Sequence, residues 1–177
     1  VSGSSSRCLV VPSTGGSPVS EVADCRHPEW SDLDTLLFAR HRDGPTSDLW
    51  RHRLATGAEE LVLEGSPELG WWQALPRPGG GLAALGGPSS IRLGVYVVGA
   101  GGGPPEQWLA PGGSYYGGTW APGGRSLVVS VDRRLLRVTA EGASPLLPST
   151  EKLLYPSFSP DGRRLAVSVE TSLSDLV

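Results

Sequence analysis

Four short segments of the chain repeat one order of residues, and their regular spacing limits the fold more than any other feature. In each segment an aromatic or apolar anchor is followed by a turn and, seven residues after the anchor, by a leucine that opens an apolar run. The four pairs are Trp30 with Leu37, Leu75 with Leu82, Trp120 with Leu127, and Phe158 with Leu165. Successive anchors are 45, 45 and 38 residues apart. One such hairpin is common by chance, whereas four in phase indicate a repeated structural unit.

The last copy, YPSFSPDGRRLAVSV at 155–169, shows what each copy encodes. Pro160 presets φ for a turn, Asp161 can accept hydrogen bonds from nearby backbone, and Gly162 tolerates positive φ. The flanking residues alternate or run apolar, which predicts two antiparallel strands joined by this turn. Strand pairs that recur about every 40–45 residues are typical of a β-propeller built from four-stranded antiparallel blades. The predicted fold class is therefore all-β.

The succession of apolar runs and Gly/Pro turns predicts about four blades' worth of chain in a single propeller domain. The first half blade would hold a third and a fourth strand, and the last would hold a first and a second strand with the start of a third at 174–177. The predicted divisions are a half blade over 7–25, blades over about 26–65, 70–110 and 115–148, and a half blade over 153–177.

The two half blades are complementary, since together they contain the four strands of one blade. Propellers close their rings in this way, which removes exposed strand edges. The sequence leaves three outcomes open: a small closed ring, a larger ring shared by two chains, and an arc that is part of a larger ring. We favour an arc cut from, or assembled into, a larger ring.

The segment PSFSPDG at 156–162 resembles the repeat of TolB-type propellers, which are PD-repeat relatives of the WD-repeat proteins. The family repeat has a proline, one variable residue, an aromatic residue and then Ser-Pro-Asp-Gly. Residues 120–124 match with glycine in place of aspartate, 28–32 keep the proline, the aromatic residue and the serine, and 75–80 carry an extra proline. The resemblance covers nearly the whole chain and implies a propeller fold, but it implies little about function.

The charge and hydropathy of the chain argue against two classes of partner. The 177 residues carry a net charge of −3, and the isoelectric point is about 5.6, which argues against nucleic-acid binding. No apolar run approaches the ~18 residues of a membrane span, so membrane insertion is not expected. The chain has no methionine, which leads us to expect a processed or excised piece.

Cys8 and Cys25 are the only cysteines, and they flank a turn at Gly15-Gly16. In an antiparallel hairpin centred on that turn they would lie near one another, so a disulfide and two free thiols are both open. A disulfide would indicate an oxidising compartment. We therefore expect an extracytoplasmic location, periplasmic or secreted, rather than a cytoplasmic one.

No catalytic residue, metal site or cofactor is predicted. Gly112–Gly117 resembles the nucleophile elbow of prolyl-oligopeptidase-type hydrolases, but a strand follows instead of a helix and no histidine occurs after His52. We therefore expect Ser114 in a loop between blades. The glycine run at 99–103 lacks the lysine and the helix of a phosphate-binding loop. The three histidines lack metal-ligand spacing, and the turn aspartates lack the spacing of a calcium loop.

Aromatic and cationic residues gather just before, or at the start of, the predicted inner strands. These residues are Arg26, His27, Trp71, Trp72, Tyr115, Tyr116 and Tyr155. In a propeller such positions surround one mouth of the central channel, where aromatic and arginine side chains are common binding anchors. The alternative is that alternate members of each pair pack between blades. The anchors Trp30, Trp120 and Phe158 are expected in the core.

These features predict a non-catalytic module of TolB-like type that binds a protein or peptide partner at the channel mouth. Self-association that completes a ring is a further predicted interaction. Two alternatives are the propeller of a larger prolyl-oligopeptidase-like hydrolase, which would gate access to a catalytic domain, and an extracytoplasmic sensor domain of a signalling protein.

Overall fold

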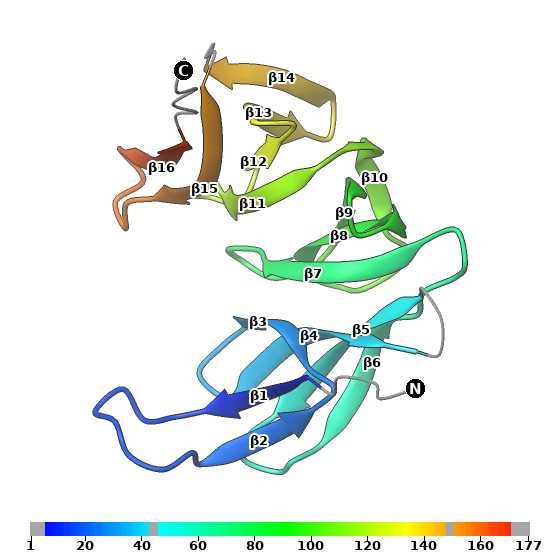
Figure 1. Ribbon diagram of the computed structural model, residues 1–177, viewed down its shortest axis with the longest axis vertical. Helices are drawn as coiled ribbons and strands as arrows, with labels where there is room; N and C mark the ends of the chain where they lie inside the picture. Colours follow the sequence, from blue (N-terminus) through cyan, green and yellow to red (C-terminus); the bar gives the residue numbers. More distant parts are fainter. Residues whose placement is uncertain (1–5, 43–45, 148–150, 171–177) are drawn as a thin grey trace, which may run out of the picture.

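The computed structural model describes residues 6–42, 46–147 and 151–170. These residues form 16 strands and no helix, in three four-stranded and two two-stranded antiparallel sheets. The predicted all-β fold class with four-stranded antiparallel blades is thus confirmed. The sheets follow one another around an open arc, with a two-stranded sheet at each end (Figure 1). The predicted start of a third strand at 174–177 lies outside the described residues.

We name the sheets in chain order. The N-terminal half-blade contains β1 (Arg7–Val10) and β2 (Ser20–Ala23). Blade one contains β3 (Arg26–Trp30), β4 (Thr35–His41), β5 (Ser47–Arg53) and β6 (Glu59–Leu63). Blade two contains β7 (Gly70–Pro76), β8 (Leu82–Ser89), β9 (Arg92–Val98) and β10 (Glu106–Gly113). Blade three contains β11 (Tyr115–Trp120), β12 (Leu127–Val131), β13 (Arg134–Thr139) and β14 (Gly142–Leu147). The C-terminal half-blade contains β15 (Lys152–Phe158) and β16 (Leu165–Glu170).

The strands of each whole blade follow the sequence from one edge of the sheet to the other. The first strands, β3, β7 and β11, are the inner strands, and β15 holds the same place in the C-terminal half-blade. They line the concave side of the arc, whereas β6, β10 and β14 lie on its convex side (Figure 1). The ring is open, since β1–β2 and β15–β16 form separate sheets at the two ends of the arc (Figure 1).

The hydrophobic core lies between neighbouring sheets and not inside any one of them. Leu85 of blade two packs with Val129 and Val138 of blade three, and all three are fully buried. Separate clusters join blade one to blade two, the N-terminal half-blade to blade one, and blade three to the C-terminal half-blade. Because the middle strands are covered on both faces, their sequences contain continuous apolar runs such as Leu127–Val129.

Trp120, at the end of β11, shows how an anchor holds the preceding blade. Its side chain is 7% exposed, and its Nε1 donates to the carbonyl oxygen of Leu75 in β7 at 2.9 Å. The indole packs edge-on against Trp108 with ring centroids 6.0 Å apart, and the guanidinium of Arg77 lies 5.1 Å from its ring centroid. The expectation that Trp120 is a core residue is confirmed.

Trp30 ends the inner strand of blade one and pairs with Leu36, as Trp120 pairs with Leu127 in blade three. Its side chain is nevertheless 52% exposed, so the expectation that Trp30 is a core residue is wrong. The preceding sheet is the N-terminal half-blade, which has two strands and supplies no inner pair for the indole to pack on. Phe158, by contrast, is partly buried against blade three.

The turns that follow the inner strands contact one another along the arc. Gly162 has a φ of 68°, and a side chain there would collide with Pro122 in the turn of blade three. In the same way, Arg77 in the turn of blade two donates from Nε to the carbonyl oxygen of Gly124 at 2.6 Å. The turns of blade three and of the C-terminal half-blade therefore each lie beside the turn of the preceding blade.

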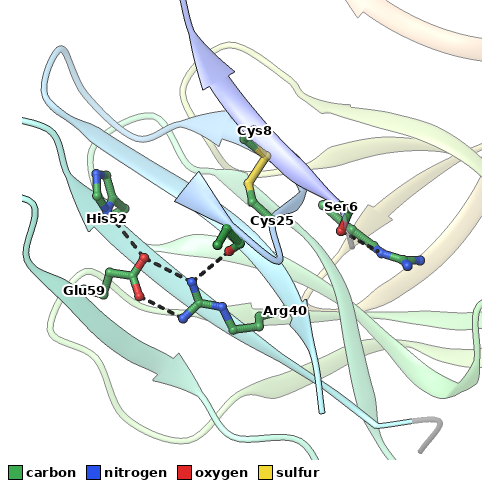
Figure 2. Close-up of a disulfide and its surroundings, with 8 residues drawn as sticks. Ser6, Cys8, Cys25, Arg40, His52 and Glu59 are labelled. Atoms are coloured by element: carbon green, nitrogen blue, oxygen red, sulfur yellow. Dashed lines mark hydrogen bonds and ion pairs between the residues drawn. A yellow bond between two sulfur atoms is a disulfide. The ribbon is translucent and has the colours of Figure 1, made fainter. Parts of the chain in front are cut away.

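A disulfide and an arginine fix the N-terminal half-blade. Cys8 and Cys25 are joined, with their Cα atoms 5.4 Å apart, so the structure contains the disulfide and not two free thiols (Figure 2). Cys8 pairs in register with Val22, and a bend at Asp24, with a φ of 49°, turns the chain so that Cys25 can reach it.

Arg40 of β4 links this half-blade to blade one. Its Nη2 donates to the carbonyl oxygen of Ala23 at 3.1 Å, and its two terminal nitrogens donate to Glu59 at 2.8 and 3.0 Å (Figure 2). The guanidinium also lies 5.0 Å from the ring centroids of Phe38 and Trp50. Because the bonds to Glu59 are charge-assisted and bidentate, the orientation of Arg40 is fixed.

Candidate functional site

All four inner strands contain a register irregularity at the same point of the repeat. The irregularity falls between Arg26 and Glu29 in β3, Trp71 and Gln73 in β7, Tyr115 and Gly118 in β11, and Leu154 and Ser157 in β15. A bulge leaves residues without a strand partner and re-aims their side chains. We call these residues the bulge row: His27, Pro28, Trp72, Tyr116, Gly117, Tyr155 and Pro156.

The backbone of the bulge row departs from strand geometry. His27 and Tyr155 both have a φ of 50°, and Gly117, at the equivalent place in blade three, has a φ of 105°. A left-handed conformation costs a bulky residue on the order of 1–3 kcal/mol and is enriched at binding sites. The Tyr155 side chain is 64% exposed, so burial of the ring does not offset this cost.

His41, the last residue of β4 in blade one, contacts the bulge row at Trp72 of blade two. Its ring meets Trp72 edge-on, with centroids 5.0 Å apart and an interplanar angle of 69°. Nε2 of His41 and Nε1 of Trp72 are buried, and neither has a hydrogen-bond partner among the described residues. Buried polar atoms in native proteins are normally paired. Nitrogens of Arg40, Trp50, His52 and Trp108 are buried and unpaired in the same way, so this property is not confined to the bulge row.

Tyr115 supplies a third atom of this kind, because its hydroxyl is buried and unpaired among the described residues. Burial raises the pKa of the Tyr115 hydroxyl, and the negative charge of Glu29 adds to the effect, so the hydroxyl stays protonated and can donate. Glu29 accepts a hydrogen bond from Nε2 of Gln73 at 2.9 Å. A cavity of about 350 Å³ opens between β3, β7 and β11, lined in part by Glu29, Gly118 and Thr119.

No protein-family model matches the sequence, and no curated protein matches it. Solved structures do match. TolB from Acinetobacter baumannii has a TM-score of 0.63 and 18% sequence identity, over 86% of this chain and 40% of TolB. The fold is that of a TolB-like β-propeller.

Two peptidases match the TolB-like propeller as well. A prolyl endopeptidase has a TM-score of 0.64 and 20% identity, over 95% of this chain and 28% of the endopeptidase. An acylaminoacyl peptidase solved with a Z-Gly-Gly-Phe chloromethyl ketone has a TM-score of 0.59 and 19% identity, over 90% and 30%. The TolB-like propeller thus spans less than half the length of each of these three proteins, and identities of 18–20% support the fold and no more.

The predicted site residues of the TolB-like propeller do not all reach its surface. The bulge row contains His27, Trp72, Tyr116 and Tyr155, Arg26 is exposed just before it, and Tyr115 lies partly buried beside it.

Trp71 is 2% exposed and packs edge-on against Tyr96, and its Nε1 donates to the carbonyl oxygen of Glu64 at 3.0 Å. The prediction that Trp71 lies at the channel mouth is therefore wrong. The bulge that follows Trp71 separates its side chain, which packs on blade one, from that of Trp72.

Three residues of the site were not among those predicted: His41, Glu29 and Gln73. The β3–β4 register pairs Arg26 with Ala39, which brings the end of β4 beside the start of β3. Only the exact pairing across the turn at 31–34 would have revealed that His41 lies there. Glu29 and Gln73 come together across two blades, and no local sequence pattern predicts a contact of that kind.

The lowered pKa values of His27 and His41 lead us to expect a loss of stability below neutral pH. Burial lowers the pKa of His41, and the charges of Arg26 and His27 add to the effect. Burial also lowers the pKa of His27, and the positive charge of Arg26 lowers it further. The negative charge of Glu29 has a smaller, opposing effect. The unfolded chain, with histidine pKa values of about 6.5, therefore binds more protons than the folded chain as the pH falls. We expect the urea midpoint to decrease between about pH 7 and pH 5.

The matched variant for this measurement is His41→Gln, which keeps a polar side chain that does not titrate. Its urea midpoint should change less between the two pH values than that of the unmodified chain. An equal change in both proteins would mean that His41 does not contribute to the pH dependence.

Ser114 lies between β10 and β11, two strands, and its backbone N–H donates to Asp132 Oδ1 at 2.8 Å. No helix follows it, so the local structure is not a nucleophile elbow. Across residues 6–42, 46–147 and 151–170, no three His, Cys, Asp or Glu side chains group closely enough to hold a metal ion. The same residues include no helical segment with the length and hydrophobicity of a membrane span.

Proposed function

We propose that this TolB-like propeller is a non-catalytic module that binds a segment of a protein or peptide along its bulge row. One observation carries the proposal: all four inner strands break register at the same repeat position, and an exposed Tyr155 is held there in a left-handed conformation. A repeated bulge lined with aromatic residues suits recognition better than stability.

The chemistry of the site fits an extended peptide. The indole N–H of Trp72 and the hydroxyl of Tyr115 are buried donors without partners among the described residues. A peptide carbonyl group that accepts from either of them must enter the bulge row, because both atoms are covered in the unbound chain. Arg26 is exposed at the start of β3 and suits a carboxylate. Tyr155 and Trp72 provide flat apolar surface at low cost in side-chain entropy.

Selection from a phage-displayed library of random twelve-residue peptides tests this proposal, followed by calorimetry with an enriched synthetic peptide. Tyr155→Gly removes the exposed ring and places glycine where φ is positive, so the fold should be as stable as before or more stable. The affinity should fall tenfold or more, the loss expected when an aromatic anchor is removed.

Ile91→Gly is the matched control, because Ile91 is 66% exposed and lies in the turn between β8 and β9, outside the bulge row. It should leave the affinity unchanged. If no peptide is enriched, or if the enriched peptide binds Tyr155→Gly as tightly as the unmodified chain, the bulge row is not the binding site.

A second candidate is the propeller of a larger peptidase, since a prolyl endopeptidase and an acylaminoacyl peptidase share the fold. In that case the bulge row would face peptide substrates on their way to a catalytic domain. Both candidates predict that this chain alone does not hydrolyse a proline-containing peptide p-nitroanilide. Hydrolysis that disappears in Ser114→Ala would overturn the non-catalytic assignment.

We also propose an extracytoplasmic location. Cys8 and Cys25 are both buried and are joined in the structure, and structural disulfides persist in oxidising compartments. Alkylation of the protein with iodoacetamide immediately on cell lysis, followed by intact-mass measurement, should show no modified cysteine.

A further inference from the structure

A cavity of about 420 Å³ opens between blades one and two, at the end of the strands away from the bulge row. Ser31, just after β3, and the loop at 99–103, just after β9, line it at that end. Arg51 of β5 and Val62 of β6 belong to the wall from blade one, and the buried Leu82 belongs to the wall from blade two. Cavities that bind ligands are typically of roughly 300–1,000 Å³, so this one is large enough for a ring system.

At the interface between blades two and three, the equivalent place is filled by large side chains. Trp108 of β10 and Trp120 of β11 meet edge-on there, with ring centroids 6.0 Å apart. The guanidinium of Arg77 lies 5.8 Å from the ring centroid of Trp108 and 5.1 Å from that of Trp120. Two indoles and one cation therefore close this interface.

The strand register identifies the corresponding residues between blades one and two. Val62 is the residue left unpaired at the irregularity of β6, as Trp108 is in β10. Val62 packs towards blade two, and Trp108 packs towards blade three. Ser31 and Arg77 each directly follow an inner strand. Valine and serine thus stand in blade one where blade two has tryptophan and arginine.

The inner strands differ in the same way. Pro76 ends β7 and Trp120 ends β11, and each pairs with the first residue of the strand that follows. The interface between blades one and two therefore has a valine, a serine and a proline where the next interface has two tryptophans and an arginine. The cavity is the space that these smaller side chains leave, and it suits an indole beside a cation.

A cation for such a ring is present in the cavity wall. Arg51 donates from Nε and Nη2 to the carboxylate of Glu60 at 2.9 and 2.6 Å. These bonds use the edge of the guanidinium and fix its plane, so its flat face is available to a ring. The face of an aromatic ring is negative and attracts a guanidinium. Arg40 and Arg77 already lie over aromatic rings elsewhere in this protein.

The edge of β6 beside the cavity suits a ring that is carried on a peptide. Among the described residues β6 pairs with β5 alone, so its outer edge can pair with an added strand. Glu60, Leu61 and Val62 of this strand also line the cavity. The outer strands of the other two blades contain Pro111 and Pro145, which hinder such pairing, whereas β6 contains no proline.

We propose that this cavity binds the indole of a tryptophan on an extended segment of a partner protein. The segment pairs with the outer edge of β6, and the ring lies against Arg51 and Val62. The site is separate from the bulge row, because it lies at the opposite end of the strands.

Titration of the isotope-labelled full chain with the peptide acetyl-Gly-Gly-Trp-Gly-Gly-amide, followed by amide chemical shifts, tests this proposal. Saturable shifts are expected at residues 60–62 and 99–103. The same peptide with leucine in place of tryptophan should bind about tenfold more weakly, since leucine offers no ring face to Arg51. Free indole should also bind more weakly, because it cannot pair with β6.

Arg51→Gln should weaken binding of the tryptophan peptide about fivefold, through loss of the cation. The fold should persist, because the ion pair with Glu60 is largely exposed and contributes little to stability. Arg53→Gln is the matched control, since Arg53 is exposed on the same strand and does not line the cavity. Val62→Trp introduces the residue that blade two has at this position, so it should fill the cavity and abolish binding.

Several results would each overturn the proposal: no saturable shift, shifts confined to the bulge row, equal affinity for the leucine peptide, or unchanged affinity in Arg51→Gln. Free indole that binds as tightly as the tryptophan peptide would assign the cavity to a small aromatic molecule and overturn the assignment to a partner protein. If Val62→Trp does not fold, Arg51→Gln alone decides.

Discussion

Trp120→Ala is expected to lower the free energy of unfolding by about 3–5 kcal/mol, the loss typical of a buried tryptophan. The indole is 7% exposed between blades two and three, and its removal leaves a cavity next to Trp108 and breaks the hydrogen bond to the carbonyl oxygen of Leu75. Arg77 would also lose the ring over which its guanidinium lies. Urea unfolding followed by circular dichroism measures the change.

Trp30→Ala is the matched control for this measurement, because Trp30 is also a tryptophan and occupies in blade one the position that Trp120 occupies in blade three. With half of its surface exposed and no inner strand of a preceding blade beneath it, Trp30 should contribute less than about 1 kcal/mol. Equal losses of unfolding free energy in the two variants would mean that burial between two blades does not make Trp120 more stabilising than Trp30.

Breaking the Cys8–Cys25 disulfide is expected to cost about 3 kcal/mol, the value for a loop of roughly this length. The two cysteines are 17 residues apart, and the crosslink restricts the unfolded chain in that segment. Cys8→Ala combined with Cys25→Ala should therefore shift the urea midpoint to lower concentration. The effect should be centred on the N-terminal half-blade, where both side chains are buried against Phe38.

Reduction of the unmodified protein provides the control for that variant. A reductant should shift the unmodified chain towards the midpoint of the double-alanine variant and should leave the variant itself unchanged. If the reductant has no effect on a protein whose cysteines resist alkylation beforehand, the disulfide does not contribute to stability.

Much of the architecture could be predicted, because propeller blades are specified by local signals. The turn at 159–162 needs proline, aspartate and glycine in order, and each of these residues acts on its own backbone. Trp120 could be assigned to the core from the repeat alone, since it holds the anchor position and a complete blade precedes it. The sequence left open only whether the blades form a small closed ring, a ring shared by two chains or an arc of a larger ring.

The predictions for Trp71 and Trp30 failed for two different physical reasons. A bulge after Trp71 breaks the alternation of the strand, so a residue that counting places at the channel is turned into the core. Trp30 obeys the repeat, but the sheet that would cover it is incomplete. The left-handed conformation of Tyr155 was equally invisible to the sequence, because a tyrosine carries no local preference for positive φ.

Because the apolar layers lie between sheets, no blade of this protein buries its own surface, and each depends on its neighbours for stability. Local unfolding should therefore start at an outermost sheet and proceed from sheet to sheet towards the middle of the arc. One outer sheet is held by a covalent bond and by Arg40. The other is held by the apolar cluster around Leu153 and by hydrogen bonds of the Leu153 backbone with Ser130 and Arg133. Amide hydrogens of β15 and β16 should accordingly exchange with deuterated water sooner than those of β1 and β2. Local unfolding would then begin at the C-terminal half-blade rather than at the N-terminal one.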